Sequence, residues 1–333
     1  MKKIAIFALC FAALACGSVQ ERPEAELMFS LKDFPELQHT HNVQGCAVFG
    51  DLLFSMQDKG WCNVFDLGSR TPVSQFPLAS YGRNQHANVA FFGPYRYDST
   101  DRFPLLYVSQ CKSKPVTEIG LAETDSLSRL LFVERILADE SGTPFGSELV
   151  QIVAYEPKQW NSRLWIADTK HPDAIWCYGN TVGNEKPGNH IVLSKFAFPE
   201  FSADRFLVTL SDEDALETFN FDDILPEGAR GPQNGILQGA FLRDGLLFLP
   251  IGVGTPDHPH ELFISDVSRF GSKRLRWAHF DYTDVIPWEP EDYDIWNDRL
   301  VFPCNTDSAG VVYSLPYRKL VRSLTVTQPD SRP

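Results

Sequence analysis

The stretch QGCAVFGDLLFSMQDKGWCNVFDL, residues 44–67, decides the fold class of this chain. It contains three alternating apolar runs, at 46–49, at 52–56 and ending at Leu67, and short polar turns separate them. Alternation with a period of two indicates strands, and a Gly-Asp turn joins neighbouring strands into a hairpin. We therefore predict a meander of three short antiparallel strands.

The same pattern returns further along the chain. QGAFLRDGLLFLPIGVG covers residues 238–254, and HELFISDV follows at 260–267. Gln44 and Phe54 have the same spacing as Gln238 and Phe248, and Asp292 and Phe302 repeat it within EPEDYDIWNDRLVFPCN. A meander that cannot bury its own faces must stack on copies of itself, so the repeat predicts a β-propeller.

Five second-strand cores mark the predicted blades. They begin at Leu52, Leu105, Arg163, Leu246 and Arg299, at intervals of 53, 58, 83 and 53 residues. A propeller blade usually takes about 40–50 residues. The long third interval holds further strand-like runs at 190–198, 205–210 and 216–221, as either an inserted hairpin or a degenerate sixth blade. We predict an all-β, five-bladed propeller, with six blades as the alternative.

The predicted propeller domain covers residues 27–326. A propeller must close its ring, because an open sheet edge invites pairing with other chains. Often a strand from one terminus completes the blade built by the other. Residues 27–31 and residues 320–326 are the two candidates for the closing strand.

Residues 1–15, MKKIAIFALCFAALA, have a basic start and an apolar core and predict a secretory signal peptide. Ala15-Cys16-Gly17 resembles a bacterial lipobox, which implies cleavage before Cys16 and lipidation of its thiol. An ordinary signal peptide with Cys16 as a spare thiol is the alternative. Residues 16–26 then form a lipid-anchored tether. We expect the protein at the outer membrane, facing the periplasm or the cell surface.

The charge and the cysteines exclude some partners and bonds. The net charge is −13, and loss of Lys2 and Lys3 with the signal makes it −15. So acidic a chain argues against nucleic acid as a partner. Five cysteines remain without any CxxC spacing, and we expect them to be buried apolar residues of different blades rather than a disulfide framework: Cys46, Cys62, Cys111, Cys177 and Cys304.

The propeller topology predicts which loops share a face. The loop that leads into the first strand of a blade lies on the same face as the loop between its second and third strands. Six of the eight histidines fall in such loops: His39, His41, His86, His171, His258 and His260. A His-x-His pair suits a divalent metal if its rings converge, so His258 and His260 are candidate ligands, with a purely structural turn as the alternative.

Lysines and glutamines add to the same predicted face. Lys59, Lys112 and Lys170 occupy the same step of three blades, where they could attract an anion or simply point into solvent. Gln44, Gln151, Gln238 and Asp292, with Glu291 beside the last, would surround the mouth of the axial channel. The expected ligand-binding residues are Gln44, His86, Lys112, Lys170, His171, Gln238 and Asp292.

Blade one also resembles a known family. Gln44-Gly45, Leu52-Leu53-Phe54, Gly60 and the run 64–67 are similar to the opening of the glutamine cyclotransferase propellers. The resemblance implies the fold and not the cyclase activity, because the EG and TW motifs that follow in that family are not matched at 88–113. The whole chain resembles the propeller lipoproteins secreted by Gram-negative bacteria, a resemblance that carries no mechanism.

Two classes of function stay open at this level. The first is a lipid-tethered module that binds a sugar, a peptide or a protein, and the absence of serine-hydrolase, zinc-protease and P-loop motifs favours it. The second is a metal-assisted hydrolase or lyase, with Glu291, Asp292 or a lysine as the acid-base group. The fold cannot choose between them, because propellers host both.

Overall fold

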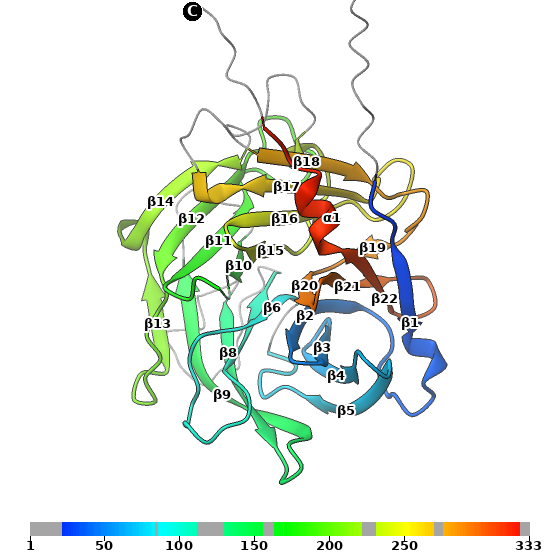
Figure 1. The fold of residues 1–333 in the computed structure, drawn as a ribbon. Helices are drawn as coiled ribbons and strands as arrows, with labels where there is room; N and C mark the ends of the chain where they lie inside the picture. Colours follow the sequence, from blue (N-terminus) through cyan, green and yellow to red (C-terminus); the bar gives the residue numbers. More distant parts are fainter. Residues whose placement is uncertain are drawn as a thin grey trace, which may run out of the picture.

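The computed structural model describes residues 22–83, 86–111, 130–155, 163–168, 170–221, 231–269 and 276–326. Its strands form five sheets arranged as a ring around a common centre, with β2, β6, β10, β15 and β20 nearest to it (Figure 1). The chain is therefore a five-bladed β-propeller, as the repeat predicts.

Blades one and two come from the first half of the chain. Blade one consists of β2 (Val43–Phe49), β3 (Leu52–Gln57), β4 (Trp61–Asp66) and β5 (Thr71–Pro77). Blade two consists of β6 (Ala87–Phe92), β7 (Leu106–Gln110), β8 (Leu131–Ala138), β9 (Pro144–Tyr155) and β13 (Leu207–Leu210).

The other three blades follow the same inside-to-outside order. Blade three consists of β10 (Leu164–Ala167), β11 (Ala174–Asn180), β12 (Ile191–Ala197) and β14 (Ala215–Asn220). Blade four consists of β15 (Phe241–Arg243), β16 (Leu246–Ile251), β17 (Glu261–Asp266), β18 (Arg276–Asp281) and β23 (Thr325–Val326). Blade five consists of β19 (Glu289–Pro290), β20 (Asp294–Trp296), β21 (Arg299–Asn305), β22 (Val311–Pro316) and β1 (Glu26–Ser30).

Each blade is apolar on both faces, because it packs between two neighbours. In β3, Phe54 and Met56 pack towards Phe92 of blade two, while Leu53 packs towards Val301 of blade five. Alternating residues of β3 thus contribute to two hydrophobic cores, one on each side of the blade. This double burial explains why a single meander cannot be stable alone and has to repeat around a ring.

Both candidate closing segments enter sheets, but in different blades. β1 pairs antiparallel with β22, so the N-terminal strand closes the ring by completing blade five. The C-terminal segment instead forms the short helix α1 (Tyr317–Arg322) and then β23, which adds an outer strand to blade four. In the part of the chain that the structure describes, no helix is long and apolar enough to cross a membrane.

The long third interval is where the predicted strand assignment is wrong. Residues 149–155 belong to β9, the fourth strand of blade two, and residues 164–167 form the first strand of blade three rather than its second. The runs at 190–198 and 216–221 then supply strands β12 and β14 of blade three. The run at 205–210 supplies β13, which pairs in parallel with β9. They form neither an inserted hairpin nor a sixth blade.

The cysteines behave largely as small apolar residues. Cys46, Cys62, Cys177 and Cys304 are buried and carry free thiols, and Cys111 is half-buried. Burial raises the pKa of the Cys62 thiol well above its usual range, so the thiol stays protonated and packs as an apolar group.

Candidate functional site

The blades give the ring two distinct faces. We call the hairpin face the one formed by the turns between the first and second strands of each blade, at 50–51, 93–105, 168–173, 244–245 and 297–298. The lead-in face is the opposite one, where the chain runs into the innermost strands and where the second and third strands connect. The sequence predicts the site on the lead-in face.

Four of the seven expected ligand-binding residues lie at the lead-in face: Gln44, His86, Gln238 and Asp292. Asn88 Nδ2 donates to Gln44 Oε1 at 3.2 Å and to Glu291 Oε2 at 3.3 Å. Gln238 Nε2 donates to Glu289 Oε1 at 3.0 Å. These contacts connect blades one, two, four and five through buried amides and carboxyls.

Asp58 and Asp292 bond to neighbouring blades. His86 Nδ1 lies 2.5 Å from Asp58 Oδ1, so blades one and two are also linked here. Asp292 is fully buried, and its Oδ2 accepts the backbone N–H groups of Cys46 and Ala90, each at 2.9 Å. Burial raises the pKa of Asp292 well above its usual range, against the lowering effect of these bonds. Asp292 of blade five thus connects the innermost strands of blades one and two.

The strand register shows that the channel-mouth residue of blade five lies one position earlier in the sequence than predicted. Phe49 pairs with Leu52, Arg243 with Leu246 and Trp296 with Arg299. Counting back from these pairs aligns Glu291, and not Asp292, with Gln44 and Gln238. Burial and the carboxylate of Glu289 raise the pKa of Glu291 well above its usual range, although Asn305 donates to it.

Because the strands of blade three begin later than predicted, three further residues lie elsewhere than expected. Lys170 and His171 lie in the turn between β10 and β11, which places them on the hairpin face. Lys170 Nζ bonds Asp244 Oδ2 at 3.0 Å there. Gln151 lies in the fourth strand of blade two, and its Nε2 donates to the Arg205 carbonyl at 3.0 Å. Lys112 lies outside the described residues.

The two candidate metal ligands go to different partners. His258 Nδ1 bonds Glu185 Oε1 of blade three at 2.8 Å. His260 is fully buried with Tyr293 Oη 3.3 Å from its Nε2, and burial lowers its pKa to about 3. The rings therefore do not converge on one point. Within the described ranges, no group of three or more His, Cys, Asp or Glu side chains is placed to hold a metal ion.

The hairpin face holds a cavity at the axis that the sequence does not predict. Its volume is about 350 Å³, and blades one to five all contribute to its lining. Aromatic and proline side chains make much of the wall: Phe49, Phe92, Pro94, Pro104, Pro172 and Phe198. The polar lining comes from Arg243, Asp168, Asp294 and Asn297.

The two carboxyl groups of this cavity are held in place by backbone donors. Asp294 Oδ2 accepts Val48 N at 2.6 Å, and its Oδ1 accepts Ile295 N at 2.7 Å. Burial raises the pKa of Asp294 to about 7, although the positive charge of Arg243 lowers it. Asp168 accepts Lys170 N and Gly245 N at 3.0 and 2.9 Å. Arg243 also lines the cavity, and its Nε lies 4.0 Å from Asp244 Oδ2 at the rim.

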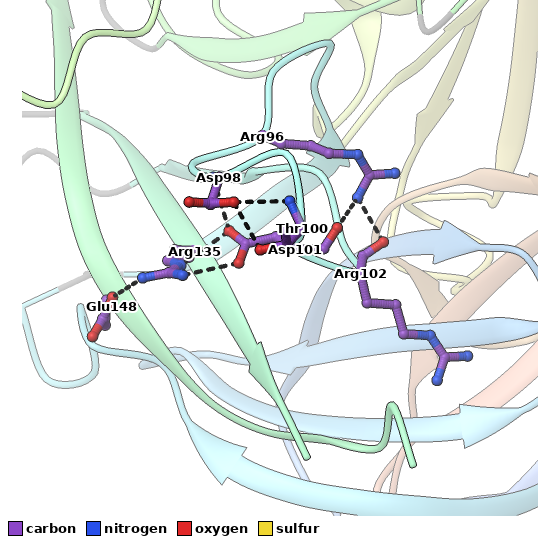
Figure 2. Close-up of polar contacts among 7 residues, drawn as sticks. All are labelled: Arg96, Asp98, Thr100, Asp101, Arg102, Arg135 and Glu148. Carbon is purple, nitrogen blue, oxygen red and sulfur yellow. Dashed lines mark hydrogen bonds and ion pairs between the residues drawn. The ribbon is translucent and has the colours of Figure 1, made fainter. Parts of the chain in front are cut away.

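The 93–105 turn of blade two forms one wall of the cavity, and ion pairs connect it to strand β8 of the same blade. Gly93, Pro94 and Pro104 of the 93–105 turn line the cavity. Behind them, Arg135 of β8 donates from two nitrogens to Asp101, at 3.0 and 2.9 Å, and from a third to Glu148 at 3.2 Å (Figure 2).

A second arginine stabilises the turn from within. Arg96 Nη1 donates to the carbonyl oxygens of Asp101 and Arg102, at 2.7 and 2.6 Å (Figure 2). Its guanidinium carbon also lies 6.0 Å from the centre of the Phe49 ring, another residue of the cavity wall. The wall is therefore held in one shape before any ligand arrives, which lowers the entropic cost of binding.

A sequence signal for this cavity exists at Arg243. The last residue of the innermost strand is Phe49 in blade one, Phe92 in blade two and Trp296 in blade five, but Arg243 in blade four. Blade three has Ala167 at this step, so Arg243 is the charged residue at a step that is aromatic in three of the five blades. The predicted site lies on the other face and does not include Arg243.

Comparisons with known proteins assign this chain to no family. No protein-family model matches the chain, and no curated protein matches it. Similar solved structures include U3-55K (9% identity, TM-score 0.34) and the WD40 repeats of RRP9 (10%, 0.35), each alignment covering 82% of this chain and 67% of the other.

A third similar structure is a proposed oxidoreductase (glucose dehydrogenase) from Thermus thermophilus. The identity is 10% and the TM-score 0.39, with 88% of this chain and 100% of the other covered. At such identities nothing about activity transfers, and the five sheets of the chain itself establish the propeller.

Proposed function

We propose that this protein is a lipid-anchored, extracytoplasmic β-propeller that binds a small ligand, or the end of a larger one, in the axial cavity of its hairpin face. The ligand carries a carboxylate on an apolar body. The observation that supports this class is Arg243, a half-buried guanidinium at the base of aromatic and proline walls. A guanidinium can bind a carboxylate through two parallel hydrogen bonds, while the walls bury an apolar group.

The electrostatics of the cavity agree with an anionic ligand. Asp168 and Asp294 already accept backbone N–H groups, and Asp294, with a pKa of about 7, is partly protonated near neutral pH. Arg243 supplies the cationic group of the same lining. In a confined apolar site, a charge-assisted hydrogen bond to it contributes about 1.5–3 kcal/mol.

Replacing Arg243 by Met tests the proposal, because Met keeps the apolar stem and removes the charge. N-acetyl-phenylalanine and its amide serve as matched probes in titration calorimetry. We expect the acid to bind wild type roughly 10- to 100-fold more tightly than the amide, and Arg243→Met to abolish that difference.

Arg322→Met is the control, since Arg322 is an exposed arginine outside the cavity lining. It should bind the acid as wild type does. Equal binding of acid and amide by wild type would show that Arg243 does not select a carboxylate, and absence of binding by both probes would remove the axial cavity as the site.

The anchor rests on the N-terminal sequence, which lies outside the described residues. Cys16→Ser removes the thiol that a lipid would modify, so we expect this variant in the soluble fraction and wild type in the membrane fraction. Immunoblots of fractionated cells measure the distribution. Cys10→Ala, within the signal peptide, should leave the protein in the membrane. If wild type and Cys16→Ser distribute alike, the protein is not anchored through this cysteine.

A further inference from the structure

A second cavity opens on the same face, between blades three and four. Its volume is about 360 Å³. Its lining includes His171, Asp173, Trp176, Lys195, Asp244 and Ser268. The two cavities have Asp168 in common, so they adjoin, one at the axis and the other further out.

Asp168 lies where the two cavities meet and is held in place. Its carboxylate accepts N–H groups from both sides, from Lys170 in blade three and Gly245 in blade four. Its backbone also forms a parallel bridge with Leu242. Because the two cavities adjoin at this fixed residue, a single extended ligand can fill both of them.

The lining of the outer cavity suits a chain with alternating donors and acceptors. Asp173 and Asp244 offer carboxylate acceptors, and Lys195, whose ammonium lies 5.5 Å from the centre of the Trp176 ring, offers a donor. Lys170 bonds Asp244 beside the cavity, whereas Asp173 is exposed. Asp173 can therefore meet a positive group of a ligand, and the net charge of −13 attracts cationic partners to the whole molecule.

We propose that the extended ligand is the C-terminal segment of a peptide, an inference that rests on the proposed function. The terminal carboxylate lies at Arg243, and an apolar last side chain lies against Phe49, Phe92 and Phe198. The preceding backbone crosses Asp168, and a basic side chain upstream lies beside Asp173. A single peptide would thus occupy both cavities and contact both Arg243 and Asp173.

Charge reversal at Asp173 tests the outer half of this arrangement. The probes are the tetrapeptide Lys-Lys-Gly-Phe with a free carboxylate and N-acetyl-phenylalanine, which is too short to extend past Asp168. We expect Asp173→Lys to weaken the tetrapeptide at least fivefold at low salt and Asp173→Asn to weaken it less, because a rim charge acts through screened electrostatics. N-acetyl-phenylalanine should bind all three proteins alike.

Asp33→Lys is the matched control, since it makes the same charge change at an exposed residue outside both linings. It should bind the tetrapeptide as wild type does. If N-acetyl-phenylalanine binds but the tetrapeptide is insensitive to Asp173, the outer cavity is not part of the site and the proposed function stands. If neither binds, the proposed function itself fails. Tighter binding of a uronic acid disaccharide than of the tetrapeptide would show that the extended ligand is a sugar.

Discussion

Two glycines explain why the Gln-Gly dipeptide repeats in blades one and four. A β-carbon at Gly239 would lie 2.2 Å from the Glu291 carbonyl oxygen, and one at Gly45 would lie 2.8 Å from the Ala87 carbonyl oxygen. At both places the backbone of a neighbouring blade comes too close for any side chain. Blade five has Asp292 at the aligned position, where the side chain enters the axis and bonds two other blades.

Gly239→Ala should therefore lower the free energy of unfolding by about 1–3 kcal/mol, because the added methyl pushes blades four and five apart. Gly146→Ala is the control, since a β-carbon there would meet nothing within 4 Å, and it should change the same quantity by less than about 1 kcal/mol. Urea denaturation followed by tryptophan fluorescence measures both. Equal effects of the two substitutions would contradict the close approach at Gly239.

At the scale of an element, the 93–105 turn is the part of the cavity that depends most on side-chain bonds. Asp98 Oδ1 accepts Thr100 N and Thr100 Oγ1 within the turn, at 2.8 and 2.7 Å (Figure 2). Arg135 then fastens the turn to β8 and stacks 4.4 Å from the centre of the Tyr97 ring. A turn of this length without such bonds would sample many conformations.

Arg135→Met should loosen this turn without unfolding the blade. Removal of its bonds to Asp101 should speed amide exchange in residues 93–105 roughly tenfold, because local opening becomes easier. Hydrogen exchange with mass spectrometry measures this, and N-acetyl-phenylalanine binding should weaken in parallel. Arg318→Met removes an exposed ion pair with Asp298 and should leave the turn unchanged. Unaltered exchange in Arg135→Met would mean that the backbone alone orders the turn.

Blade three shows what alternation cannot predict about an element. The second half of β9 is fully buried even though β9 is a fourth strand, because β13 covers its outer edge. An outer strand covered in this way is buried at successive residues, as an inner strand is, so its sequence pattern is the same. Gln151 was therefore predicted at the mouth of the axial channel, and the same error placed Lys170 and His171 on the wrong face.

At the scale of the whole molecule, the fold could be predicted and the place of the candidate cavity could not. The blade number follows from hairpins at recurring intervals, which any propeller sequence must encode locally. The axial cavity depends on which innermost-strand ends meet at one point, such as Phe49, Phe92 and Arg243, far apart in the sequence. That meeting is a property of ring closure, and the sequence signal at Arg243 does not show which other residues it meets.

Closure by β1 also sets an order of events during synthesis. β1 pairs through Glu26 with Ser314, which the ribosome adds 288 residues later. At roughly 5–20 residues per second, the first strand waits about 15–60 s for its partner. During that time the backbone of β1 has no strand partner, although Phe29 can already pack against Phe65 of blade one. A neighbouring copy that has already made its own β22 offers the same edge, so crowded newborn chains can exchange their first strands.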